Sequence, residues 1–173
     1  MFKSILVAVD GSEPSTNAVR IAARMAAEQG AKLTLLHALH HSASPSHLRE
    51  VAESLNFTDR IEDELEDVDV VTTAAMAPGV AVVTSLSAKA LKKFGEQLVG
   101  ALSERAKSEG VKTIVTHFTD EAPAKGILDY AENHGIDLIV LGSRGMGKMT
   151  GLILGSVSQK VIEDSALPCL VVK

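Results

Sequence analysis

Residues Asp137 to Ala166 read DLIVLGSRGMGKMTGLILGSVSQKVIEDSA, and this stretch decides the fold. It begins with a short uncharged apolar run, residues 138–141, which predicts a buried strand. A glycine-rich loop, residues 143–155, comes next, and a segment of helical apolar spacing opens at Ser156. The stretch therefore predicts a strand that passes through a flexible loop into the start of a helix.

This arrangement is suited to binding phosphate. Glycines let backbone N–H groups approach a ligand closely, because no Cβ stands in the way. The free N–H groups and the dipole at a helix start favour negative charge, and Ser156 and Ser158 add hydroxyl donors there. The alternative is a glycine-rich loop that only closes a strand–helix connection.

Two common phosphate-binding motifs do not fit this loop. Gly142 to Lys148 has the spacing of a Walker A loop, but Met149 stands where a magnesium-binding Ser or Thr is required. The dinucleotide pattern G-x-G-x-x-G also fails, because Thr150 occupies its third glycine position.

A third spacing, G-x2-G-x9-G-S, matches at four positions: Gly142, Gly145, Gly155 and Ser156. This pattern resembles the nucleotide-binding signature of the universal stress protein family. Four matched positions in a strand–loop–helix context favour nucleotide binding over a plain connection. The resemblance covers residues 3–39 and 101–172, including EGVKT before the third expected strand and DLIVLGSRG at the loop.

Composition limits the class of protein. The chain has 173 residues and no Trp, so we expect one domain with a core of Val, Ile, Leu and Ala. A net charge of −5 argues against general nucleic-acid binding, which depends on basic surfaces. The only cysteine, Cys169, fits a reducing compartment and has apolar neighbours. The start of the chain carries no secretory signal, so we expect a cytoplasmic location.

The N-terminal part predicts a strand, a helix and a second strand. Residues 5–9 form an apolar strand, Ser12 caps a helix that Gly30 ends, and Lys32 to Leu39 form the second strand. Asp10 follows the first strand directly, at the edge where open α/β sheets place their ligands. It either caps the helix start or belongs to the site, and we favour the site.

The rest of the chain completes an α/β fold. Apolar spacing predicts helices over 90–110, 123–135 and from 156, and strands over 111–118, 138–141 and 169–172. We expect a doubly wound, flavodoxin-like or Rossmann-like sheet of five parallel strands in the order 3-2-1-4-5, with helices on both faces. This order brings Asp10 and Gly142 together at the switch point between strands one and four.

Residues 40–85 form an insertion of helices and loops in this plan. His40, His41 and His47 lie near several serines, but their spacing matches no zinc motif, which favours a solvated loop. An acidic helical face follows. From Val70 to Ala88 no residue is charged, yet Pro78-Gly79 interrupts the stretch. We therefore expect a lid or a partner-contacting helix here and no membrane span.

The resemblance implies a site and a ligand. The family's nucleotide-binding branch takes ATP, usually with a divalent cation (Mg²⁺ or Mn²⁺), and Asp10 corresponds to the acid that meets the ribose or the metal. Ala8 and Val9 lie beside the base, and Ala38 packs on adenine. One departure is Asp120-Glu121 before Pro123, which adds negative charge near the expected ligand edge. The nucleotide-binding residues expected from the resemblance are Ala8, Val9, Asp10, Ala38, Leu141, Gly142, Arg144, Gly145, Gly155, Ser156, Val157 and Ser158.

The resemblance also implies a homodimeric regulator in stress signalling, with an unknown client protein. The apolar segment 168–172 ends the sheet and is the expected dimer edge. Three alternatives stay open: a slow ATPase, an enzyme that phosphorylates itself on Ser156 or Ser158, or a binder of AMP or cyclic AMP. Arg144 and Lys148 supply charge for phosphoryl transfer or lie on a solvated loop. No catalytic motif is present, which favours the regulator and assigns no catalytic residue.

Overall fold

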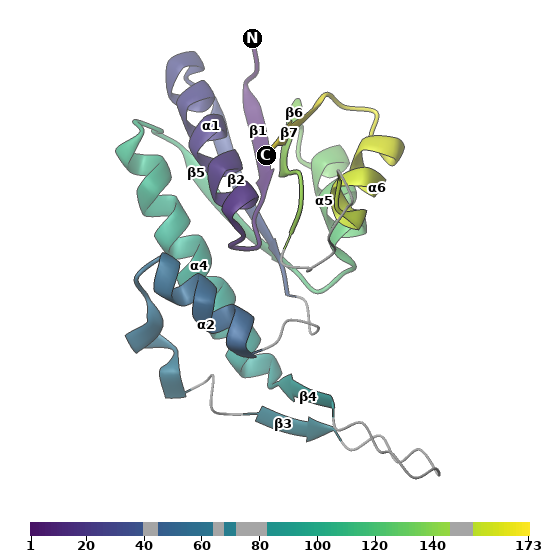
Figure 1. The fold of residues 1–173 in the computed structure, drawn as a ribbon. Helices are drawn as coiled ribbons and strands as arrows, with labels where there is room; N and C mark the ends of the chain where they lie inside the picture. The colour runs from purple at the N-terminus through teal and green to yellow at the C-terminus, as the bar shows by residue number, and fades with distance from the viewer. Residues whose placement is uncertain (40–44, 64–67, 72–82, 146–153) are drawn as a thin grey trace.

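The computed structural model describes residues 1–39, 45–63, 68–71, 83–145 and 154–173. Its main sheet has five parallel strands in the order β5-β2-β1-β6-β7 (Figure 1). These strands are β1 (Ser4–Ala8), β2 (Lys32–Ala38), β5 (Ile114–Thr119), β6 (Leu138–Gly142) and β7 (Cys169–Val172). Counted along the chain without the separate β3–β4 pair, this is the predicted order 3-2-1-4-5, which is confirmed.

Two helices cover each face of the sheet. Helices α1 (Glu13–Gln29) and α4 (Ala88–Ser108) pack together on one face, over a core that includes Ile5, Val7 and Leu33. Helices α5 (Pro123–Asn133) and α6 (Ser156–Asp164) pack on the opposite face, and the core beneath them includes Leu6 and Ile139. Alternate residues of each strand therefore face alternate helix layers, which explains why the strands are predominantly apolar.

Local sequence explains where α1 begins and ends. The Ser12 side chain accepts a hydrogen bond from the Ser15 amide, and Pro14 stands in the first turn, where its missing N–H costs nothing. Gly30 ends the helix with a positive φ of 65°, in the left-handed region that glycine enters without strain. The predicted caps are thus confirmed, and α1 leads directly into β2.

The insertion has two parts that differ in how they pack. Helix α2 (Pro45–Ser54) and the short 3₁₀-helix η1 (Thr58–Arg60) join the α1–α4 core through Leu48, Val51 and Phe57. Strands β3 (Val68–Val71) and β4 (Val83–Leu86) form a separate antiparallel pair that lies beyond the start of α4 (Figure 1).

The helix expected across Val70 to Ala88 is wrong where the structure describes this stretch. Residues 70–71 lie in β3 and residues 83–86 form β4, just before α4 begins at Ala88, and the valine and threonine residues of these strands are β-branched, which favours extended backbone. Residues 72–82 lie outside the described part. Within the described ranges, no helix is both long and apolar enough to cross a membrane.

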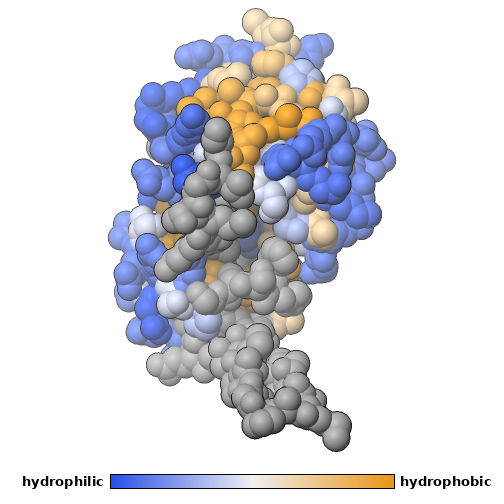
Figure 2. All heavy atoms as spheres, turned by 45° about the vertical axis from the view of Figure 1, so that its right-hand side comes forward, coloured by the Kyte–Doolittle hydropathy of each residue, from blue (hydrophilic) through white to orange (hydrophobic). Residues whose placement is uncertain are grey.

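Strand β7 lies at one edge of the sheet, as predicted. Cys169, Leu170 and Val171 are half-buried, so this edge presents apolar side chains to the outside. Figure 2 shows an apolar area in the upper part of its view, between hydrophilic surfaces on either side. Cys169 is less buried than its apolar neighbours suggest, and its thiol lies 3.5 Å from the Leu167 carbonyl.

Candidate functional site

The carboxyl ends of β1 and β6 lie side by side at the centre of the sheet. Val7 pairs with Val140, so the residues that follow each strand emerge together. The chain continues from β1 to β2 on one side and from β6 to β7 on the other, which makes this the switch point of the topology. The predicted meeting of Asp10 with the start of the glycine loop is therefore observed.

The Asp10 carboxylate organises the turn after β1. Its Oδ1 accepts hydrogen bonds from the Ser12 amide at 3.0 Å and from the Ser12 hydroxyl at 2.7 Å. The Asp10 amide in turn donates to the Ser15 hydroxyl oxygen at 3.1 Å. The Ser12 Oγ also lies 3.3 Å from the carbonyl oxygen of Arg144, so it links this turn to the glycine loop.

Gly142 and Gly145 stand where the end of β6 and the loop after it closely approach residues 10–15. A Cβ at Gly145 would lie 2.5 Å from Oδ2 of Asp10, and a Cβ at Gly142 would lie 2.7 Å from the Ser15 amide nitrogen. A side chain at position 145 would force the Asp10 carboxylate to move, and one at position 142 would collide with backbone, so glycine at both positions lets the two loops meet as they do. Asp10 therefore has one oxygen held by Ser12 and the other directed at the glycine loop.

Ser143 joins the two ends of that loop. Its carbonyl accepts a hydrogen bond from the Gly155 amide at 2.8 Å and lies 3.1 Å from the Ser158 hydroxyl. Its own amide donates to the Val172 carbonyl at 2.6 Å, which ties the loop to β7 as well. The start of α6 is thereby fixed beside the end of β6, with its first backbone N–H groups at the same edge as Asp10.

The serines at the start of α6 differ in exposure. Ser156 is exposed, whereas Ser158 is only 4% exposed and its hydroxyl lies 2.9 Å from the Gly155 carbonyl and 3.1 Å from that of Ser143. The Ser158 proton therefore has protein acceptors. Gly155 precedes the helix without a side-chain cap, so the helix N-terminus is formed by backbone alone.

The other predicted residues occupy three kinds of position. Ala8 and Ala38 are half-buried at the ends of β1 and β2. Val9 and Leu141 are buried in the two cores, at 3% and 2% exposure. Val157 is half-buried in the first turn of α6, and Arg144 is exposed. Apart from Val157, all of them lie at or next to the carboxyl ends of β1, β2 and β6.

A buried histidine is the main residue that the sequence prediction missed. His37 is 5% exposed, and its Nδ1 lies 2.8 Å from the Val9 carbonyl oxygen. A carbonyl can only accept, so Nδ1 carries the proton. Burial lowers the pKa of His37, although the hydrogen bond to Val9 and the charge of Asp10 act in the opposite direction. The signal in the sequence was a single polar ring inside the apolar strand KLTLLHA.

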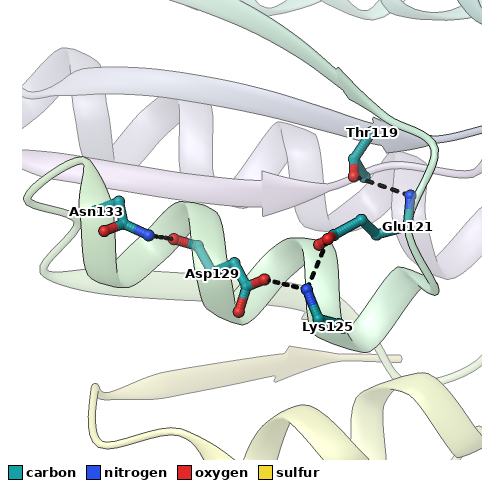
Figure 3. A network of polar contacts seen from close by, with 5 residues as sticks. All are labelled: Thr119, Glu121, Lys125, Asp129 and Asn133. Carbon is teal, nitrogen blue, oxygen red and sulfur yellow. Dashed lines mark hydrogen bonds and ion pairs between the residues drawn. The ribbon is translucent and has the colours of Figure 1, made fainter.

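The extra negative charge after β5 is paired with a lysine. Lys125 lies 2.6 Å from a carboxylate oxygen of Glu121 and 2.6 Å from one of Asp129, and the three side chains follow the exposed surface of α5 (Figure 3). These bonds raise the pKa of Lys125 to about 12. Glu121, just before α5, thus meets a cation in the first turn of that helix, which reduces the negative field it adds to the ligand edge.

The described residues hold no group of three or more His, Cys, Asp or Glu side chains arranged to bind a metal. Of the three histidines noted in the insertion, His47 lies in α2. His40 and His41 fall outside the described residues. Asp10 is the acidic side chain that the structure brings into contact with the glycine loop.

An open α/β sheet with a glycine-rich loop at its switch point defines a class of ligand-binding domains. Comparison with known proteins narrows that class. The model of the universal stress protein family matches residues 1–173, and the chain belongs to this family. It is 33% identical over 177 residues to universal stress protein YxiE of Bacillus subtilis, with both chains covered completely.

Solved structures agree with the fold. The chain is similar to a universal stress protein in complex with cAMP, with a TM-score of 0.58, 23% identity and coverage of 99% of this chain and 96% of the other. It is also similar to the universal stress protein from Archaeoglobus fulgidus in complex with dAMP, with a TM-score of 0.59 and 20% identity. That match covers 99% of this chain and 98% of the other.

Proposed function

We propose that this chain binds ATP together with Mg²⁺ or Mn²⁺ at the carboxyl edge of β1 and β6, and acts as a nucleotide-dependent regulator. The observation that carries the proposal is the contact between Asp10 and Gly145, which a single Cβ would block. It joins a carboxylate to a glycine loop and a helix start. Adenine nucleotides bound to two structurally similar family members support this ligand class.

Each part of the site suits one part of ATP. The half-buried Ala8 and Ala38 offer small apolar surfaces for the adenine ring, beside the buried Val9. Asp10 accepts hydrogen bonds from ribose hydroxyls, or holds the cation jointly with phosphate oxygens. The backbone N–H groups of the described part of the glycine loop, up to Gly145, and of the α6 start supply donors for the phosphates. The remaining predicted contacts are those of Leu141, Arg144, Gly155, Ser156, Val157 and Ser158.

A regulator fits these residues better than an enzyme does. Phosphoryl transfer needs a positioned nucleophile and charge stabilisation at the γ-phosphate. Ser158 is a poor acceptor because its buried hydroxyl has protein carbonyls as partners. Ser156 is exposed, which keeps slow self-phosphorylation as the second candidate. Turnover of ATP by purified protein, measured beside binding, separates the two.

Calorimetry of Gly145→Ala tests the proposal. We expect no detectable ATP binding in the presence of Mg²⁺, because the new Cβ pushes Asp10 away from the loop. Gly100→Ala is the matched control, since Gly100 is exposed in α4 and a Cβ there meets nothing within 4 Å. Unchanged affinity in a folded Gly145→Ala protein would refute the site. Titrations with AMP and cyclic AMP on the same proteins identify the preferred adenine nucleotide.

The apolar β7 edge supports a homodimer in which the two β7 strands pair antiparallel about a twofold axis. We place this dimer in the cytoplasm, where its client protein is unknown. Val171→Pro removes one ladder donor from β7 and should yield monomers in light scattering. A Val171→Pro protein that stays dimeric, while deletion of residues 44–76 gives monomers, would move the interface to the insertion.

A further inference from the structure

One peptide group at the end of β1 is held from both sides by side chains. The strand pairs with β2 as far as Ala8, and the Val9 amide still donates to the Leu36 carbonyl at 2.8 Å. The next carbonyl, that of Val9, meets the His37 imidazole at 2.8 Å. A side chain from β2 thus takes a place where ladder pairing would otherwise continue.

The amide nitrogen of the same peptide group is held as well. The Val9 carbonyl and the Asp10 amide belong to one rigid plane. His37 Nδ1 donates to the oxygen, and the amide donates to the Ser15 hydroxyl oxygen at 3.1 Å. Two side chains from different elements therefore set the orientation of this plane. The orientation of this plane determines the direction in which the Asp10 side chain leaves the backbone.

The imidazole has little room to move. Its centroid lies 6.4 Å from the ring of Phe94 in α4 and 6.4 Å from that of Phe118 in β5. A Cβ at Gly95 would lie 2.8 Å from its Cδ2 and 3.3 Å from its Nε2. Glycine at position 95 lets α4 close against the ring, so the helix holds His37 in the rotamer that reaches Val9.

We infer that His37 is a positioning residue for the ligand at Asp10: its Nδ1–H orients the Val9–Asp10 peptide and so aims the carboxylate at the glycine loop. His37 acts through Val9 and Asp10 and not by contact with the nucleotide. The effect on ATP affinity rests on the proposed function, whereas the effect on the Asp10 backbone does not.

His37→Leu and His37→Asn separate the hydrogen bond from packing. Leucine keeps an apolar side chain without the donor, while the asparagine amide nitrogen lies close to where Nδ1 stood. In ligand-free protein we expect the NMR amide signals of residues 10–12 to shift or broaden in His37→Leu and to recover in His37→Asn. The Kd for ATP should rise about threefold to tenfold in the leucine variant, the effect of one hydrogen bond, and recover with asparagine.

Gly95→Ala is a second variant that leaves His37 in place and displaces its ring, and Gly100→Ala on the same helix is its control. Gly95→Ala should reproduce the amide changes and Gly100→Ala should not, which also decides the matter if His37→Leu does not fold. Unchanged amide signals in both folded variants would overturn the inference. Wild-type protein that binds no adenine nucleotide would refute the proposed function alone, because the ligand-free spectra still test His37.

Discussion

Two aspartates at opposite ends of the central strands β1 and β6 have different hydrogen-bond partners. Asp137 stands before β6, at the amino edge of the sheet. Its Oδ2 accepts from the Lys3 amide at 2.7 Å and its Oδ1 from the Ser4 amide at 3.2 Å. Asp10 stands after β1, at the carboxyl edge, where Ser12 holds Oδ1 and Gly145 approaches Oδ2.

The difference follows from the groups that lie at each edge of the sheet. At the amino edge, the backbone amides at the start of β1 take both oxygens of Asp137, so its charge completes strand pairing. At the carboxyl edge, Gly145 of the glycine loop lies opposite one oxygen of Asp10. Under the proposed function, Asp137 therefore contributes to stability and Asp10 to ligand binding.

Of substitutions at the two aspartates, Asp10→Asn should have the larger effect on ATP binding. The substitution removes the charge that would meet ribose or the cation, while the amide oxygen still accepts from Ser12. We expect the Kd for ATP with Mg²⁺ to rise about 10-fold to 150-fold, the effect of losing one charge-assisted hydrogen bond. Calorimetry measures this change. Unfolding by urea should change little, and a variant that loses stability while binding normally would make Asp10 purely structural.

Asp137→Asn should give the opposite result. Asparagine keeps one acceptor and loses the charge, so one of the amides of Lys3 and Ser4 loses its partner. We expect a loss of about 1–2 kcal/mol in the free energy of unfolding, because these bonds are only partly shielded from water. The midpoint of thermal unfolding should fall by about 2–4 °C for each kcal/mol in a chain of this size. ATP affinity that fell along with stability would show that the two edges are coupled.

The fold was predictable because its signals are local. Short segments rich in apolar residues mark the strands of the main sheet, and Ser12 and Gly30 mark the ends of α1. Most strand boundaries differ by one residue at most, but the third strand of the sheet was expected from Val111 and β5 begins at Ile114. Val111 precedes the strand but is a buried core residue at 6% exposure. Its apolar side chain therefore indicated burial and not strand structure.

The site was predictable only in outline. Asp10 and Gly142 could be placed because each stands at the end of a recognisable strand. The contacts that hold them, from His37 to Val9 and from Ser143 to Gly155 and Val172, join residues distant in the sequence. Such pairings leave no periodic pattern. For the same reason the sequence did not indicate that Phe57 of the insertion packs edge-on against Phe94, with ring centroids 5.7 Å apart.

The smallest expected effect concerns pH and the histidine beneath Asp10. Burial lowers the pKa of His37 in the folded protein, so the unfolded chain takes up a proton near pH 6.5 while the folded chain does so only at lower pH. Stability should therefore be constant, as far as His37 is concerned, above about pH 7 and fall as the pH drops through about 6.5. The slope for one group is at most about 1.4 kcal/mol per pH unit.

Urea unfolding at several pH values between 7.5 and 5.5 measures this slope in the wild type and in His37→Asn. The charged and titratable groups near His37 include Asp10, whose charge opposes the shift. His117 needs its own control, His117→Asn, because burial and the neighbouring His134 lower its pKa as well and give a slope of the same sign. We expect His37→Asn to remove the larger share, since His37 is 5% exposed and His117 is only half-buried. If His37→Asn keeps the full wild-type slope while His117→Asn removes it, the buried ring does not titrate with folding, and the acid sensitivity belongs to the edge strand β5.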